Sequence, residues 1–176
     1  MVARPAVAAV PASPWAAMDK GQLDVVLRGL AEVDMIGDVP LSAQTAASLC
    51  EIEKVMPEAR DLFALHALFR DHDGWGGRRE VRIDLSVIAA ACHAGQPLRI
   101  GYTDLKGAQT TRVIWPLTLV YPPHGVFVLA WCCARQGYRQ FFAHAIDHVA
   151  PEAGSFGDRR AGLLAGLVAE QRTKRA

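Results

Sequence analysis

The sequence predicts an α+β protein in which a small antiparallel β-barrel is flanked by an N-terminal helical hairpin and a C-terminal helix. Three observations predict this class. Apolar residues recur at helical spacing in residues 19–55 and 158–171. Short apolar runs separated by tight turns fill residues 98–149. The 176 residues are 51% hydrophobic and 21% charged, which is the composition of a globular protein with a sizeable core.

The N-terminal part predicts a leader and then a helical hairpin. Residues 1–17 are rich in proline and alanine, so we expect an extended, flexible segment. A helix follows over residues 19–33, with Asp19 as its N-cap. Ser42 is expected to cap a second helix that ends before Pro57. Two short amphipathic helices are not stable alone, so this hairpin must pack against another element.

The middle of the chain gives weaker signals. Residues 58–69 are apolar enough for either a short helix or a buried strand, and residues 71–79 form a loop by their glycines and charges. A short strand is one interpretation of residues 80–83. Asp84 then caps a helix over residues 85–93, which Gly95 and Pro97 end.

Short strands with tight turns follow. We expect them at residues 98–103, 110–121, 126–133, 138–143 and 146–149. Pro116 must bend the second strand or place it at an edge, because proline cannot donate a ladder hydrogen bond. The third strand is apolar on both faces and is therefore expected to be central. We divide the chain into a leader (1–17), a helical linker or dimerisation region (18–70), a barrel domain (80–157) and a C-terminal helix with a basic tail (158–176).

Composition excludes several classes of function. The net charge is +1, so polyanion binding would need a local arginine cluster. No stretch reaches the ~20 apolar residues of a membrane span, and the N-terminus lacks a secretory apolar core, so we expect no membrane partner and a cytoplasmic protein. The cysteines lack CxxC spacing and are expected to be reduced core thiols, with no metal or cofactor bound; they are Cys50, Cys92, Cys132 and Cys133. No catalytic motif is present, and we do not expect an enzyme.

Four segments of the strand region carry a resemblance to a known family. They read LRIGY at residues 98–102, IWPL at 114–117, LAWC at 129–132 and RQF at 139–141. In this order they resemble the WYL domain of bacterial transcriptional regulators, most closely its YafY-like branch. SLCEIEKVMP at residues 48–57 and RRAGLLAGL at 159–167 also resemble that family, so the likeness covers about residues 15–172.

The resemblance implies an Sm-like (SH3-type) barrel that senses an effector and acts on transcription. In that family an attached winged helix binds DNA, but only about 17 residues precede the first helix here. We therefore expect indirect action without sequence-specific binding of duplex DNA, because no recognition helix is available. The alternative is a truncated or split regulator whose winged helix is missing. A third alternative, a hydrolase or transferase using Arg139 and His144, requires an open cleft that holds both side chains.

One departure from the family bears on the effector. The family's strand with two arginines reads FAHAI at residues 142–146, so two positive charges are absent. This predicts weak nucleic-acid binding or a more apolar ligand. The unknown effector is thus a small ligand, for example a nucleotide, or single-stranded nucleic acid. The other expected partner is a second copy or a full-length relative, which would pair through the apolar stripe of the helical hairpin.

The candidate ligand residues lie on or beside the expected strands. Guanidinium groups can bind phosphate or carboxylate in bidentate fashion, and aromatic rings can stack on planar ligands. The alternative for the arginines is a solvated strand position, and for the aromatic rings a place in the core. The candidates are Arg99, Tyr102, Arg112, Phe127, Arg135, Arg139, Phe141 and His144.

Overall fold

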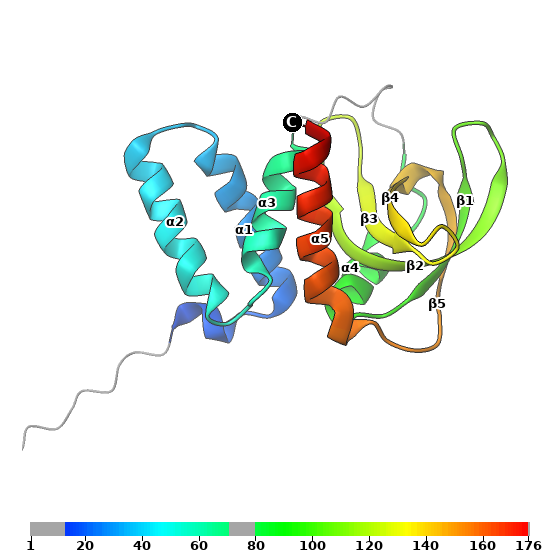
Figure 1. The fold of residues 1–176 in the computed structure, drawn as a ribbon, viewed down its shortest axis with the longest axis horizontal. Helices are drawn as coiled ribbons and strands as arrows, with labels where there is room; N and C mark the ends of the chain where they lie inside the picture. Colours follow the sequence, from blue (N-terminus) through cyan, green and yellow to red (C-terminus); the bar gives the residue numbers. More distant parts are fainter. Residues whose placement is uncertain (1–12, 71–79, 176) are drawn as a thin grey trace, which may run out of the picture.

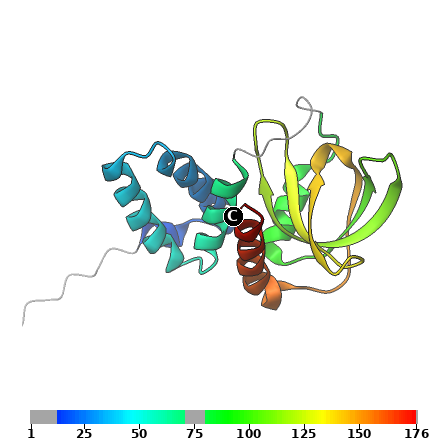
Figure 2. The same cartoon turned by 45° about the horizontal axis from the view of Figure 1, so that its top comes forward.

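Three N-terminal helices lie side by side and form one layer of the molecule. They are α1 (Lys20–Asp34), α2 (Val39–Glu53) and α3 (Ala59–Phe69). The computed structural model describes residues 13–70 and 80–175. The C-terminal helix α5 (Gly157–Arg175) lies between this layer and a curled β-sheet (Figures 1 and 2). No helix in the described ranges is long and apolar enough to cross a membrane.

The start of α1 agrees with the prediction and the start of α2 does not. The Asp19 carboxylate accepts a hydrogen bond from the backbone N–H of Gln22 at 2.8 Å, and the Gln22 side chain accepts one from the Asp19 N–H at 2.9 Å. The prediction that Ser42 caps α2 was wrong, because Asp38 does so by accepting from the Leu41 N–H at 3.0 Å. Pro40 therefore lies in the first turn, where no N–H is required.

The structure also resolves one ambiguous prediction in the first half of the chain and corrects two others. The ambiguous residues 58–69 form α3, and its buried stripe faces the core. Residues 14–17 are not extended: they form a short 3₁₀ helix, η1 (Pro14–Ala17), and Trp15 packs against the core. Residues 80–83 form no strand. The expected loop at 71–79 and most of the expected leader, residues 1–12, lie outside the described residues.

Five strands form one antiparallel sheet in the order β4-β3-β2-β1-β5. Their bounds are β1 (Leu98–Thr103), β2 (Gln109–Val120), β3 (Phe127–Cys132), β4 (Gly137–Phe142) and β5 (Ile146–Pro151). The α+β class and the central place of β3 are thus confirmed. A short 3₁₀ turn, η2 (Ala143–Ala145), joins β4 to β5, and no ladder pairs these two strands in the described part of the chain, so the sheet is open there. Closure into a barrel stays a prediction.

A bulge in β2 changes which side chains share a face. The register with β3 shifts between Pro116 and Thr118, as expected for a proline that bends a central strand. Strict alternation along β2 predicts Leu117 and Leu119 on the same face. Instead Leu117 joins the core beside the helices, while Leu119 joins the core on the other face of the sheet. The extra residue of the bulge is the reason, since it reverses the parity of the strand.

The buried residues form two hydrophobic cores, one on each face of the sheet. The first lies between the helical layer, α5 and one face of β2 and β3. The second lies inside the curled sheet and is covered by α4 (Leu85–Ala94), whose Asp84 N-cap and left-handed Gly95 C-cap are those predicted. Because the second core fills the interior of the sheet, ligands can reach the sheet only at its ends and outer surfaces.

Candidate functional site

A hollow of the described surface lies at one end of the curled sheet. It has a volume of about 540 Å³ and opens between the β1–β2 turn on one side and η2 with the start of β5 on the other. Its lining comes from three separate parts of the chain. These residues are Arg82, Tyr102, Thr103, Asp104, Leu105, Gly107, Gln109, Phe142, His144, Ala145, Ile146 and Asp147.

Two of the predicted ligand residues, Tyr102 and His144, line this hollow. The Tyr102 ring is held edge-on to Phe141 with centroids 5.1 Å apart, and its side chain is largely buried. Burial raises the pKa of the Tyr102 hydroxyl, while a hydrogen bond with the Phe142 backbone and the nearby Arg112 act in the opposite direction. The hydroxyl therefore stays protonated at neutral pH and offers a hydrogen-bond donor. His144 lies against Phe142, with ring centroids 5.2 Å apart.

Two carboxylates and one guanidinium group lie among the described lining residues of the hollow. Asp104 accepts hydrogen bonds from the backbone N–H groups of Lys106 and Ala108, each at 2.9 Å, and so shapes the β1–β2 turn. Asp147 is exposed and also lines a neighbouring hollow of about 270 Å³. Arg82 is also exposed, and it is the one arginine among the described lining residues. The arrangement therefore suits a ligand with several hydrogen-bonding groups rather than a multiply charged anion.

Gly101 determines where the Asp147 carboxylate lies. A Cβ atom at position 101 would overlap Asp147 Oδ1, which is the far end of a flexible side chain. Gly101→Ala is therefore expected to displace this carboxylate from the hollow at a stability cost below about 1 kcal/mol. Amide chemical shifts should change around residues 101–102 and 146–148 and stay constant in α1–α3. A loss of more than about 3 kcal/mol would show that the backbone, and not the carboxylate, has to move.

The predicted arginines do not gather in one place. Arg99 forms an ion pair with Glu152. The Arg112 guanidinium lies 5.9 Å from the centre of the Tyr102 ring, and its Nε donates to Thr110 at 3.0 Å. Arg135 is exposed in the β3–β4 turn. Arg139 lines a separate hollow of about 210 Å³ beside α5, whereas His144 lines the hollow at the end of the sheet.

The two phenylalanines among the candidates lie in the cores. Phe127 and Phe141 are each 2% exposed and pack in the first and the second core, respectively. Their burial agrees with the alternative interpretation of these residues as core. Phe141 still contributes indirectly, because it holds the Tyr102 ring.

Sequence reasoning missed Arg82, Asp104 and Asp147 as lining residues. Asp104 was recognisable only as part of a turn. Arg82 follows no regular element, and Asp147 becomes a lining residue only because η2 turns the chain back across the end of the sheet. A tight turn opposite a short polar segment is the signal that could have indicated this site.

Cysteine chemistry does not contribute to the hollow. Burial raises the pKa of the Cys92 thiol to about 12, so it is not a nucleophile at neutral pH. Cys132 is also buried, but Cys50 is exposed and Cys133 half-buried, so the prediction of four core thiols was wrong for Cys50. Within residues 13–70 and 80–175 no three metal-ligating side chains come together.

A family model matches the part of the chain that forms the sheet. Residues 84–151, which include most of the hollow's lining, match the family model described as WYL domain. No curated protein matches the chain. Among solved structures, the proteasome accessory factor B/C (PafBC) of Arthrobacter aurescens is similar with 24% identity over 80% of this chain and a TM-score of 0.44. The chain spans 22% of the length of that protein.

Proposed function

We propose that this chain, whose residues 84–151 match the WYL-domain family model, senses a small polar effector at the end of its curled sheet and acts on transcription as a regulator. The observation that carries the proposal is the hollow between the β1–β2 turn and η2, which Tyr102 and His144 line within the matched segment. Its volume of about 540 Å³ falls in the range of small-molecule sites. The proposed role is binding and not catalysis, in the cytoplasm.

The charges favour a small ligand over single-stranded nucleic acid. Phosphate backbones are bound by clustered cations that release counterions. Here Arg99 is neutralised by Glu152, Arg139 lies in another hollow, and Asp147 faces the proposed site. A short oligonucleotide is therefore expected to bind weakly and with little dependence on salt.

A panel of compounds tests the proposal. Thermal unfolding of the chain is followed with nucleoside monophosphates, amino acids, polyamines and a short oligothymidylate strand. A ligand present at 100 times its dissociation constant stabilises the fold by about 2.7 kcal/mol, which raises the melting temperature by roughly 5–10 °C. We expect such a shift for a small polar compound. A larger, salt-sensitive shift with oligothymidylate would contradict the proposal.

His144 and Arg139 distinguish the proposed hollow from the other one. His144→Ala removes a polar group from the lining, and we expect it to weaken the compound found in the panel about tenfold, the value of one hydrogen bond. Arg139→Ala is the matched control, because Arg139 is exposed and lines the separate hollow beside α5. Isothermal titration measures both. If Arg139→Ala abolished binding and His144→Ala left it unchanged, the effector would bind beside α5.

A further inference from the structure

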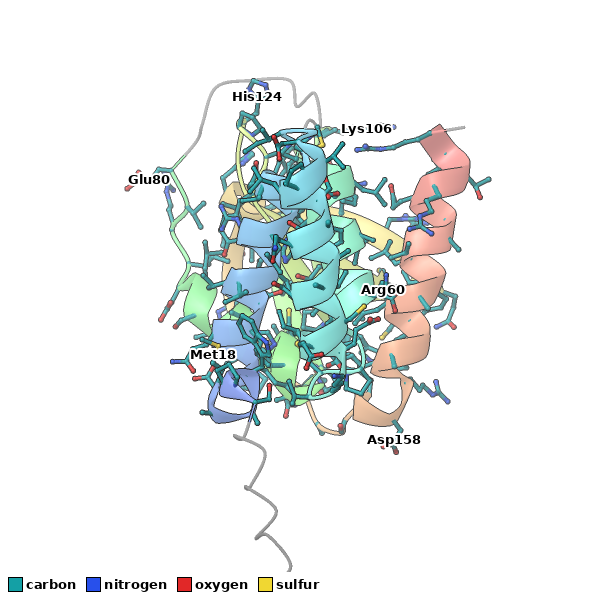
Figure 3. The ribbon with its side chains drawn as sticks, turned by 90° about the vertical axis from the view of Figure 1, so that its left-hand side faces the viewer. Met18, Arg60, Glu80, Lys106, His124 and Asp158 are labelled. Carbon is teal, nitrogen blue, oxygen red and sulfur yellow. The ribbon has the colours of Figure 1, made fainter. Side chains whose placement is uncertain are left out.

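A second apolar stripe of α3 faces an open groove. Opposite its buried stripe, α3 carries Phe63, Ala64, Ala67 and Leu68, which are spaced three and four residues apart and are only half-buried. Apolar side chains on two sides of a helix are normally covered on both. Here these side chains line a groove of about 470 Å³ between α2, α3 and the end of α5. Figure 3 shows Arg60 in the space between α2 and α5.

Four arginines surround this apolar floor. Arg60 and Arg70 come from α3 and its C-cap, and Arg172 and Arg175 from the last turns of α5. Glu53 binds the Arg60 guanidinium through hydrogen bonds of 2.7 and 2.5 Å. Arg172 and Arg175 are exposed, and Arg172 acts on the Asp61 carboxylate, lowering its pKa against the larger effect of burial. Glu53 offsets the charge of Arg60, and Asp61 offsets part of the charge of Arg172, so the excess positive charge of the rim lies at the end of α5, on Arg172 and Arg175. We define these residues as the arginine-rimmed groove.

The turn between α1 and α2 carries exposed apolar residues flanked by acidic ones, which complements the apolar floor and arginines of the groove. Ile36 is 68% exposed and Val39 79% exposed, and Glu32, Asp34 and Asp38 flank them. Asp38 caps α2, but Glu32 and Asp34 lie in the last turn of α1, where carboxylates are unfavourable to the helix dipole. The stability of α1 therefore does not explain these two acids. We define residues 32–39 as the acidic tip.

Groove and tip lie at the same end of the molecule. The α1–α2 turn and the C-terminal end of α5 are on one side in Figure 1, and Met35, between Asp34 and Ile36, itself lines the groove. A two-fold axis at this end would let each copy insert its tip and receive the other, which is the arrangement of a closed dimer. The apolar stripe of α1 cannot serve instead, because Leu23 and Leu27 are buried in the chain's own core.

We propose that the arginine-rimmed groove of one copy of this chain receives the acidic tip of a second copy, in a reciprocal, two-fold symmetric dimer. Ile36 and Val39 cover the apolar stripe of α3, and the acids of the tip face Arg172 and Arg175. No groove or tip residue lines the effector hollow. The dimer and the proposed function can therefore fail independently.

Charge reversal on each side tests the dimer. Sedimentation of the wild-type chain is measured from about 1 to about 200 μM, the range of a weak association. Asp34→Arg and Arg172→Glu each place like charges at both contacts of a symmetric dimer, so each is expected to raise the dissociation constant at least about tenfold. In a mixture of the two variants, the heterodimer has one wild-type contact and one with the charges exchanged. We expect the mixture, and the double variant alone, to associate again.

Two further variants control for the change of charge and test the apolar part of the contact. Arg135→Glu reverses an exposed arginine outside the groove and is expected to dimerise like the wild type. Ile36→Asn removes the apolar part of the contact at an exposed position and should also weaken association, while circular dichroism shows that the fold is kept. A wild-type chain that stays monomeric over the whole range overturns the proposal. So does a mixture of the two charge variants that fails to associate while both are folded.

Discussion

Arg160→Met is expected to lower the free energy of unfolding by about 3–5 kcal/mol, the usual cost of breaking a buried ion pair. Arg160 is 4% exposed and binds groups from three other parts of the chain. Its guanidinium donates to the Glu58 carboxylate at 2.7 Å, to the Cys92 carbonyl at 2.6 Å and to the Leu117 carbonyl at 3.2 Å. All three acceptors lose a partner in the variant.

The two carbonyl groups have no ready substitute. Cys92 is in the last turn of α4, where helical carbonyls have no partner within the helix. Leu117 is the residue skipped by the ladder at the β2 bulge. Arg160 thus satisfies the end of one helix and the irregular point of one strand at once, and it holds both against α3.

Urea denaturation measures the effect, with Arg159→Met as the matched control. Arg159 is exposed and lies 5.5 Å from the centre of the Trp115 ring, so its loss should cost no more than about 1 kcal/mol. Adding Glu58→Gln to Arg160→Met should cost less than the sum of the single changes, because one buried charge is then no longer left without its partner. An Arg160→Met chain within about 1 kcal/mol of the wild type would contradict this account.

Gly95→Ala is expected to cost about 3 kcal/mol or more for two separate reasons. Gly95 ends α4 with φ = +65°, which side chains rarely adopt. A Cβ atom here would also lie 2.6 Å from Gly157 Cα and 2.7 Å from Gly157 N, both of which are backbone atoms. The start of α5 would therefore have to move, together with the 2.9 Å hydrogen bond from the Phe156 N–H to the Gly95 carbonyl.

Gly107→Ala separates the two causes. Gly107 has φ = +81°, but a Cβ atom added there would meet nothing within 4 Å, so its substitution carries only the backbone cost of about 1–2 kcal/mol. The difference between the two variants in urea denaturation measures the contact between the end of α4 and the start of α5. Equal losses in both variants would mean that α5 adjusts freely.

Local signals explain why much of the fold was predictable. Asp19, Asp84 and Gly95 act within one turn of their own position, and β1 has the predicted bounds because turn residues delimit it. The start of α2 was placed at Ser42, after Pro40, although proline is favourable in a first turn. Leu119 was assigned to the wrong face because the bulge depends on pairing with β3, which no local pattern indicates.

The candidate site was predictable only in part, for a similar reason. Tyr102 and His144 were named because they lie on or beside the expected strands, and both line one hollow. The arginines were named by the same logic but lie apart, since side-chain direction and ion pairs such as Arg99 with Glu152 depend on tertiary packing. Arg160 was not singled out, because nothing in a helical RRAGLL segment distinguishes a buried arginine from its exposed neighbour Arg159.

The place of α5 between the helices and the sheet has a consequence for how the chain can be divided. The first core joins Leu117, Val120, Phe127 and Leu129, which lie inside the matched segment 84–151, to α1, α3 and α5, which lie outside it. The matched segment produced by itself would leave this apolar face uncovered and prone to aggregation. The smallest cooperative unit therefore includes the helices on both sides, and the boundaries of the sequence family are not the boundaries of an independently folding piece.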